Sequence, residues 1–549
     1  MQLFIIDAIG PFFKKYTRET INWSKIPFSH LEDDDGLDMS KFKKIRQEFK
    51  HFIDIVAELG YNAISIDDLA HLVSFDFYPE EMASLIRQYQ SAYDTLFKYA
   101  RKKGLQIFIT TDVMFFNRWI DARTAKRPGK INELLHIAIE KLFHQFDVQG
   151  LILRIGESDG VDVKGTFKSR LTVRTPRQVN KLIKQLLPVF EKRQKQMIFR
   201  TWTVGIYPIG DLIWNERTFA RTFADINSDF FIVSMKFGDT DFYDDLELSP
   251  LFAIGPHKKI VELQARRERE GFGELPYYVG WQYEKYYKQL SELENMVGVS
   301  VWCQSGGWST WRNRTFLRES SMWNELNTRA IIDIYKHGMT ADESLQKAAK
   351  KEERIAFIRE AYELIHDILY IKELSDQPVY FRRLRIPPLI WLYWDHVVLN
   401  PLLIALLEYM GVSKYKMPKN QLANFHKKGK KLGIRNIDYM HDTLMILARC
   451  RRIMWKNSIK PKHVEHIENY KRRYDMPLKF SIHIAQTNYS KARLAFKIFL
   501  RRRPQYRFID RILLSFLVSA AFRFVYRLLN KNLPSFVNKQ AMRVDMLFK

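Results

Sequence analysis

The stretch FFIVSMKFGDTDFYDDLELSPLF, residues 230–252, decides the fold, because an apolar run passes directly into a loop crowded with acids. Its first eight residues are almost continuously apolar, which is typical of a parallel strand buried on both faces. Lys236 stands near the end of this run. Five acidic residues follow it: Asp239, Asp241, Asp244, Asp245 and Glu247. The stretch therefore predicts a buried strand that ends in a polar loop.

Seven further runs of this kind are spread over the first 300 residues. With the run above they are LFIID (3–7), NAISI (62–66), LQIFIT (105–110), GLILRI (150–155), QMIFRTW (196–202), FFIVSMKF (230–237), IVELQ (260–264) and GVSVWC (298–303). Amphipathic stretches such as 49–60 and 179–193 lie between them. Eight strand–helix units predict an α/β fold, a (β/α)8 TIM barrel over residues 1–340. A doubly wound open sheet is the alternative, but no glycine-rich phosphate loop follows the first strand.

The pattern becomes helical after residue 340. We expect residues 341–411 to form a helical extension that packs on the barrel. Its most apolar window, 387–410, is interrupted by Asp395, His396 and Pro401, so buried core helices are favoured over a membrane span. Residues 412–549 are expected to form a basic helical C-terminal region.

The positive charge of the chain lies almost entirely in this last region. Of the formal net charge of +26, residues 411–549 contribute +25, from 32 Lys and Arg against 7 Asp and Glu. The segment 507–532 has the spacing of an amphipathic basic helix, which predicts peripheral contact with an anionic membrane surface. The alternative is that this helix packs on its own chain. We expect no nucleic-acid partner, because no recognition motif accompanies the charge.

Cysteine content and the N-terminus bear on cofactors and location. Only two cysteines, Cys303 and Cys450, are present, which excludes a disulfide framework and a cysteine-rich zinc site. We expect no metal and no cofactor. The N-terminal MQLFIIDAIGPFF has no basic segment before its apolar run and no cleavage site. The expected location is therefore the cytoplasm, and the basic C-terminal helix adds the expectation of peripheral attachment at the inner face of the membrane.

Function in such a barrel lies at the carboxyl ends of the strands. The residues at or just after these ends are Asp67, Asp68, Asp112, Arg154, Glu157, Arg200, Trp202, Lys236, Asp241, Glu262, Glu268 and Trp302. Carboxylates with tryptophans suit glycoside hydrolysis, and the cations suit a substrate that carries its own carboxylate. The alternative for any single acid is a helix cap or a solvated side chain. We expect that of Asp244, Asp245 and Glu247.

Several segments resemble the α-glucuronidases of glycoside hydrolase family 67, which are inverting (β/α)8 enzymes. The segments are FIVSMKFGDTDFYDDLELSPLF (231–252), KKIVELQARREREG (258–271), GLILRIGESDG (150–160), MIFRTW (197–202) and LGYNAISIDDL (59–69). The resemblance covers roughly residues 1–345 and lacks the family's N-terminal β domain. It implies a divergent family barrel that acts on a uronic-acid-containing glycan.

The resemblance also implies a role for each site residue. Glu157 falls on the general acid, with Asp159 as a second candidate, and Asp241 and Glu268 fall on the pair of base carboxylates. Arg154, Arg200 and Lys236 fall on positions that contact the uronic acid, and Trp202 and Trp302 complete the expected substrate-binding set. The alternative function is that of a membrane-associated protein of envelope or capsular polysaccharide assembly, or a glycan-binding protein with a modified barrel.

Overall fold

The fold is described by a computed structural model of the chain. It describes residues 1–13, 26–125, 129–155, 165–203, 208–210, 212–238, 242, 246–265, 275–303, 317–318, 322–369, 417–454, 469, 472 and 473. The structural statements below concern these residues.

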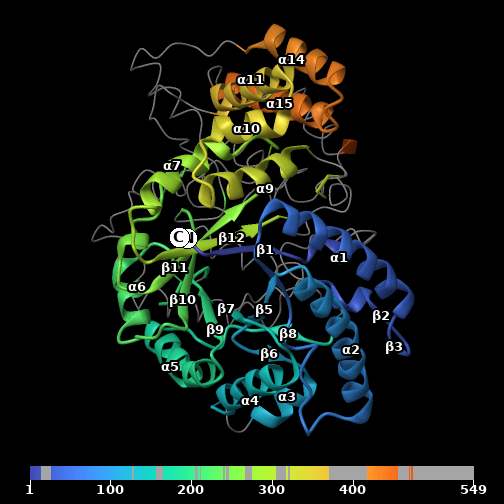
Figure 1. The fold of residues 1–549 in the computed structure, drawn as a ribbon, viewed down its shortest axis with the longest axis vertical. Helices are drawn as coiled ribbons and strands as arrows, with labels where there is room; N and C mark the ends of the chain where they lie inside the picture. The colour runs from blue at the N-terminus through green and yellow to red at the C-terminus, as the bar shows by residue number, and fades with distance from the viewer. Residues whose placement is uncertain are drawn as a thin grey trace.

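Eight parallel strands close into a barrel (Figure 1). They are β1 (Leu3–Asp7), β4 (Ala63–Asp67), β5 (Gln106–Asp112), β7 (Gly150–Arg154), β9 (Gln196–Arg200), β10 (Phe231–Lys236), β11 (Lys258–Gln264) and β12 (Met296–Trp302). Their order around the barrel is β1-β12-β11-β10-β9-β7-β5-β4. The (β/α)8 barrel predicted from the sequence is confirmed, and each of the eight apolar runs overlaps one of these strands.

The interior of the barrel explains why glycine occurs in two of the strands. A Cβ atom at Gly150 would collide with the backbone of Gln196 on β9, and one at Gly298 would collide with the backbone of Leu3 on β1. Only a residue without a side chain allows these strands to approach so closely. The lower interior is filled by one apolar side chain from each of several strands, including Ile5 and Phe108.

Helices cover the outside of the barrel (Figure 1). They are α1 (Met39–Leu59), α2 (Glu80–Lys102), α3 (Arg118–Thr124), α4 (Lys130–Gln145), α5 (Pro176–Arg193), α6 (Glu216–Phe223), α7 (Gly280–Leu290) and α9 (Met322–Tyr335). Helix α1 shows the local cause: Asp38 caps its first turn by accepting from Lys41 N, and it ends at Gly60, where φ is 104°. The predicted amphipathic stretches 49–60 and 179–193 fall on α1 and α5.

Short elements complete the described part of the barrel. Two small antiparallel ladders pair β2 (Glu32–Asp33) with β3 (Gly36–Leu37) and β6 (Phe115–Phe116) with β8 (Lys168–Ser169). The 3-10 turns are η1 (Gly10–Phe13), η2 (Phe28–His30) and η3 (Pro250–Ala253). Two of these elements, η2 and β8, bring side chains to the carboxyl ends of the strands.

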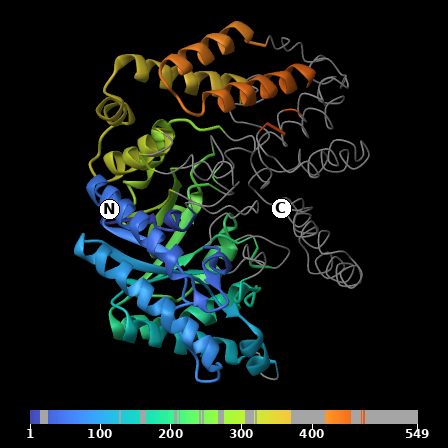
Figure 2. The ribbon, with the colours of Figure 1, turned by 90° about the vertical axis from the view of Figure 1, so that its right-hand side faces the viewer.

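Four more helices form a group on the outer side of the barrel, next to α7 and α9 (Figure 1 and Figure 2). They are α10 (Ala341–Ala349), α11 (Glu352–Leu369), α14 (Lys419–Lys431) and α15 (Ile437–Met454). Phe357 of α11 stacks on Phe425 of α14, with ring centroids 4.9 Å apart. The predicted domain limits at 340 and 411 stay predictions, and the segments 387–410 and 507–532 lie outside the described residues. Within the described part of the chain, no helix is long and apolar enough to cross a membrane.

Candidate active site

A polar layer lies directly above the apolar floor of the barrel. Floor residues include Ile5, Ala63, Phe108, Ile152, Ile198, Ile232 and Ile260. Because side chains alternate along a strand, the residue two positions further on also faces inward. Those residues are Asp7, Ser65, Thr110, Arg154, Arg200, Ser234 and Glu262. Every one of them is polar. The inward-facing side chains of these strands therefore change from apolar to polar between one inward-facing position and the next.

Glu262 on β11 is the central acceptor of a hydrogen-bonded group on one side of this layer. Its side chain is wholly buried. Its Oε1 accepts from Arg200 Nε (2.9 Å) and from the Ser234 hydroxyl (2.6 Å). Its Oε2 accepts from Trp302 Nε1 (3.0 Å). The guanidinium of Arg200 also lies 4.6 Å from the centroid of the Trp302 ring. One buried carboxylate therefore fixes an arginine and a tryptophan side by side.

Lys236 lies against aromatic rings at the end of β10. Its Nζ is 3.5 Å from the centroid of the Trp202 ring and 4.5 Å from that of Phe242. A cation over an aromatic face is attracted by the negative charge density of the ring. Two predicted substrate-binding residues, Lys236 and Trp202, are thus in contact with each other.

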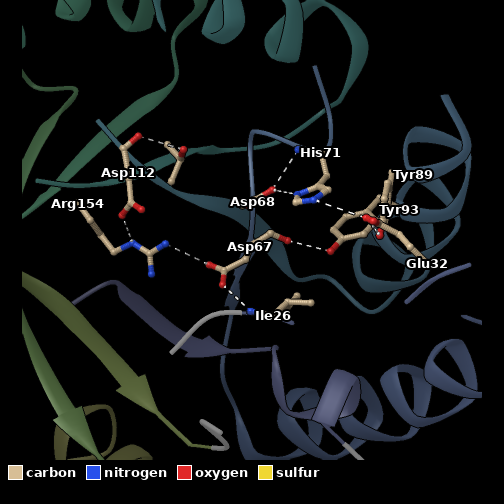
Figure 3. Close-up of polar contacts among 10 residues, drawn as sticks. Ile26, Glu32, Asp67, Asp68, His71, Tyr89, Tyr93, Asp112 and Arg154 are labelled. Carbon is tan, nitrogen blue, oxygen red and sulfur yellow. Dashed lines mark hydrogen bonds and ion pairs between the residues drawn. The ribbon is translucent and has the colours of Figure 1, made fainter. Parts of the chain in front are cut away.

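Arg154 lies between two aspartates on the other side of the barrel (Figure 3). Its Nε is 3.0 Å from Asp112 Oδ1, and its Nη2 is 3.8 Å from Asp67 Oδ1. Asp67 Oδ2 accepts from the backbone N–H of Ile26 (3.1 Å). All three side chains are largely buried, so the ion pairs are shielded from water and hold the guanidinium in place.

Asp68 belongs to a second polar group beside Asp67 (Figure 3). Its Oδ1 lies 2.7 Å from His71 Nδ1 and accepts from the backbone N–H of His71 (3.1 Å). The imidazole is stacked on Phe28, with centroids 3.5 Å apart. On its far side, Nε2 lies 4.0 Å from Glu32 Oε1, which accepts from the Tyr89 hydroxyl (2.9 Å). His71 therefore orients the Asp68 carboxylate.

Buried tyrosines support this group as neutral donors. Burial raises the pKa of Tyr89 well above its usual value, and the adjacent Glu32 carboxylate acts in the same direction. Burial likewise raises the pKa of Tyr93, whose hydroxyl donates to the backbone oxygen of Asp67 (2.9 Å). Both phenols thus keep the protons that they donate, Tyr89 to Glu32 on β2 and Tyr93 to the last residue of β4.

Two cavities open at these side chains. The first cavity encloses about 310 Å³ of empty space, part of it open to solvent. Its lining includes Asp7, Ser65, Asp67, Thr110, Arg154, Arg200, Ser300 and Trp302. The second cavity encloses about 580 Å³, and its lining includes Phe28, Asp67, Asp68, His71, Asp112, Arg154, Phe167 and Lys168. Asp67 and Arg154 line both, so the two cavities adjoin.

The structure brings together part of the predicted site. Arg154, Arg200 and Trp302 line the first cavity, whereas Lys236 and Trp202 are absent from its lining. The predicted catalytic residues Glu157, Asp241 and Glu268, with the alternative Asp159, lie outside the described residues. Their places in the site therefore stay predictions.

Three functional candidates were missed by reasoning from the sequence. Asp7 lines the first cavity and accepts from the backbone N–H of Cys303 (2.6 Å), and its inward direction follows from counting two residues from Ile5. His71 comes from the loop after β4 and Glu32 from the two-residue strand β2, and no periodic signal predicts that either of them approaches the end of β4. Within the described residues, no group of three or more His, Cys, Asp or Glu side chains could hold a metal ion.

Comparisons with known proteins find no matching family model and no matching curated protein. Among solved structures, a family 89 glycoside hydrolase from Clostridium perfringens in complex with PUGNAc aligns at 10% identity and a TM-score of 0.42, covering 92% of this chain and 65% of that one. The structure named CpGH84B aligns at 12% and 0.36, covering 78% and 70%. A β-mannanase from the blue mussel Mytilus edulis aligns at 11% and 0.31, covering 62% and 94%. Likenesses this weak carry no argument about function.

Proposed function

We propose that the barrel is a glycoside hydrolase that acts on a uronic-acid-containing or otherwise anionic glycan. The observation that carries the proposal is the first cavity, where Arg154 and Arg200 meet Asp67 and Trp302 at the carboxyl ends of the strands. In (β/α)8 enzymes this is the end where chemistry takes place. The cavity offers both charges and an aromatic edge in one place.

The arginines favour an anionic substrate. Arg200 is buried, and its Nε is occupied by Glu262. Within the described part of the chain, its Nη1 and Nη2 groups have no hydrogen-bond partner. An arginine fork binds a carboxylate through two parallel hydrogen bonds, so this guanidinium suits the acid group of a uronic sugar.

The remaining lining favours a sugar as the rest of the ligand. Carboxylates such as Asp7 and Asp67 accept hydrogen bonds from sugar hydroxyls, and Trp302 presents an aromatic surface to the apolar face of a ring. Asp68 in the second cavity is held by His71 and adds a further acceptor. A polar cavity with one aromatic wall is the composition expected for such a ligand.

We assign the catalytic roles from the sequence resemblance. Glu157 is the general acid, and Asp241 and Glu268 position and deprotonate the attacking water. An inverting site needs its acid and base about 6.5–9.5 Å apart, with room for that water between them. Glu157 follows β7 by three residues, and Asp241 and Glu268 follow β10 and β11 by five and four residues. These short distances along the chain allow all three to reach the same end of the barrel.

The proposal is tested by measuring hydrolysis of paired aryl glycosides that differ only in a uronate or hydroxymethyl group at C5. We expect turnover of the uronoside and release of a product with inverted anomeric configuration. Proton NMR of the reaction detects which anomer is released. Turnover of the neutral glycoside alone would refute the anionic substrate, and retention would refute the inverting mechanism. Absence of turnover together with tight uronate binding would favour a glycan-binding protein.

A second candidate function is a membrane-associated role in envelope or capsular polysaccharide assembly. The observation in its favour is the net charge of +25 in residues 411–549. Basic residues near an anionic bilayer each contribute about 1 kcal/mol to attachment. In this case the barrel would bind a glycan while the C-terminal region holds the protein at the membrane surface.

A further inference from the structure

We propose that Glu262 is the positioning residue that makes the first cavity selective for an anion. It acts through Arg200 and Trp302 and does not touch the ligand itself. The inference rests on the proposed function, because it concerns how that cavity tells a uronate from a neutral sugar. Because Glu262 is itself negatively charged, a role in favouring anion binding is the opposite of what its charge alone predicts.

The contacts of Glu262 exclude a direct role in binding. Its side chain is 0% exposed, and it is absent from the lining of the first cavity. Both oxygens are used, Oε1 by Arg200 and Ser234 and Oε2 by Trp302. The three donors come from β9, β10 and β12, so the carboxylate connects three strands around β11.

The pairing determines which end of Arg200 meets the cavity. With Nε directed at Glu262, the Nη1 and Nη2 groups are the donors left for a ligand. The Trp302 ring lies against the same guanidinium, and its own N–H is held by the same carboxylate. A long, flexible side chain is thus fixed before the ligand arrives, which lowers the entropy lost on binding.

Charge alone predicts the opposite behaviour. A carboxylate close to an anion site repels the anion, so its neutralisation should strengthen anion binding. If Glu262 instead positions Arg200, its neutralisation should weaken anion binding, because the arginine loses its fixed direction. The sign of the change therefore separates a positioning role from a simple electrostatic one.

The experiment measures binding of glucuronate and of glucose to the full chain by calorimetry. Glu262→Gln keeps the size of the side chain but removes its charge. We expect it to weaken glucuronate binding about tenfold or more, as for the loss of a charge-assisted hydrogen bond, and glucose binding far less. Trp302→Phe keeps an aromatic ring and leaves the ion pair between Arg200 and Glu262 intact, so it should weaken binding of both sugars by similar factors. Glu140→Gln is the matched control, since Glu140 pairs with Arg193 on the outer surface (3.0 Å).

Two further measurements keep the test decisive. If Glu262→Gln fails to fold, Ser234→Ala removes only one hydrogen bond to Oε1 and should weaken glucuronate binding about two- to tenfold. Hydrogen exchange of the Trp302 indole N–H needs no ligand, and it should become faster in Glu262→Gln. Unchanged exchange would overturn the positioning of Trp302 whatever the ligand proves to be.

The outcomes separate this inference from the proposed function. Stronger glucuronate binding by Glu262→Gln, or equal losses of affinity for both sugars, would overturn the positioning role. The proposed function would still stand if the unmodified protein prefers glucuronate to glucose. If the unmodified protein binds glucose as tightly as glucuronate, the proposal of an anionic substrate is overturned. The exchange result would then decide whether Glu262 holds Trp302.

Discussion

Glu262 and Arg200 form a buried ion pair that reaches from β11 to β9, across the intervening β10, with 2.9 Å between Oε1 and Nε. A buried pair of this kind is strongly destabilised when one partner is removed, because the other charge is left without compensation. The pair therefore fixes the geometry of the first cavity and limits which substitutions the site tolerates. Arg200 serves both this pair and the proposed ligand.

Arg200→Ala should weaken uronate binding much more than binding of the matching neutral sugar. Each charge-assisted hydrogen bond to the uronate carboxylate contributes about 1.5–3 kcal/mol, which corresponds to roughly 10- to 150-fold in affinity. Glu262→Gln in the same protein should restore folding if the unpaired carboxylate unfolds the single variant. Calorimetric titration with glucuronate and glucose measures the two affinities.

The control for Arg200 is Arg193→Ala on α5. Arg193 also pairs with a glutamate, Glu140, but on the outer surface of the barrel. It should leave both affinities unchanged. Equal losses of glucuronate and glucose in Arg200→Ala would speak against an anionic pocket.

Glu157→Gln should lower hydrolysis of any uronoside substrate by about 10² or more, the usual contribution of a general acid. The loss should be smaller for substrates whose leaving group needs no proton, such as a nitrophenol. Comparing aryl uronosides with leaving groups of different pKa measures this difference. A fully active Glu157→Gln variant would transfer the role to Asp159, and Asp159→Asn is then the variant to test.

How far the sequence predicts this molecule depends on the range of the interaction. Eight apolar runs predict the eight strands because burial on both faces of a parallel strand leaves a continuous local signal. Alternation from Ile5 or Ile198 also leads to the inward direction of Asp7 and Arg200. That Arg200 reaches Glu262 depends on the register of three strands, which no local pattern contains.

Loops mark the limit of prediction for the same reason. Asp68 was predicted at the end of β4, but its partner His71 was not. The stacking of His71 on Phe28 joins segments 43 positions apart in the chain, and neither has a periodic pattern. The predicted acids Glu157, Asp241 and Glu268 all lie outside the described residues, so the catalytic set remains a prediction.

Lys259→Met should stabilise the protein at pH 7. Lys259 is wholly buried at the start of β11, and burial lowers its pKa to about 8. At pH 7 folding therefore places a charged amine in the interior, at a cost of about 3 kcal/mol. Its Nζ donates to Gly255 O (3.1 Å), but that oxygen also accepts from Asn295 Nδ2 (3.2 Å), so methionine leaves no orphaned acceptor.

The stabilisation should depend on pH in a defined direction. Since the pKa is lower in the folded state than the usual value near 10.5, the native protein gains stability as pH rises from about 8 to 10.5. The advantage of Lys259→Met should therefore be largest below pH 8 and fade above it. Urea denaturation at pH 7 and pH 10 measures this, with Lys285→Met on the outer helix α7 as control. A less stable variant at pH 7 would show that the amine contributes more than its burial costs.

The C-terminal region should attach to anionic membranes through residues 507–532. At helical spacing this segment places a row of apolar side chains beside Arg507, Arg511, Arg523 and Arg527. Each arginine near an anionic surface contributes about 1 kcal/mol, so replacing all four with glutamine should abolish most of the binding. The full chain should sediment with phosphatidylserine vesicles at low salt and be released at high salt, because the attraction is screened.

The quadruple variant is a sharper test than a chain ending at residue 410. Helices α14 and α15 lie beyond that point and pack on α11, where Lys428 pairs with Glu360 (2.7 Å), so the truncation would also expose the core of the helical layer. A matched variant replaces Lys427, Lys430, Lys431 and Arg435 with glutamine, which removes the same charge from a described helical unit. We expect it to keep vesicle binding. If the full chain stays in the supernatant, or if both quadruple variants lose binding equally, residues 507–532 are no membrane anchor and the membrane-associated function falls.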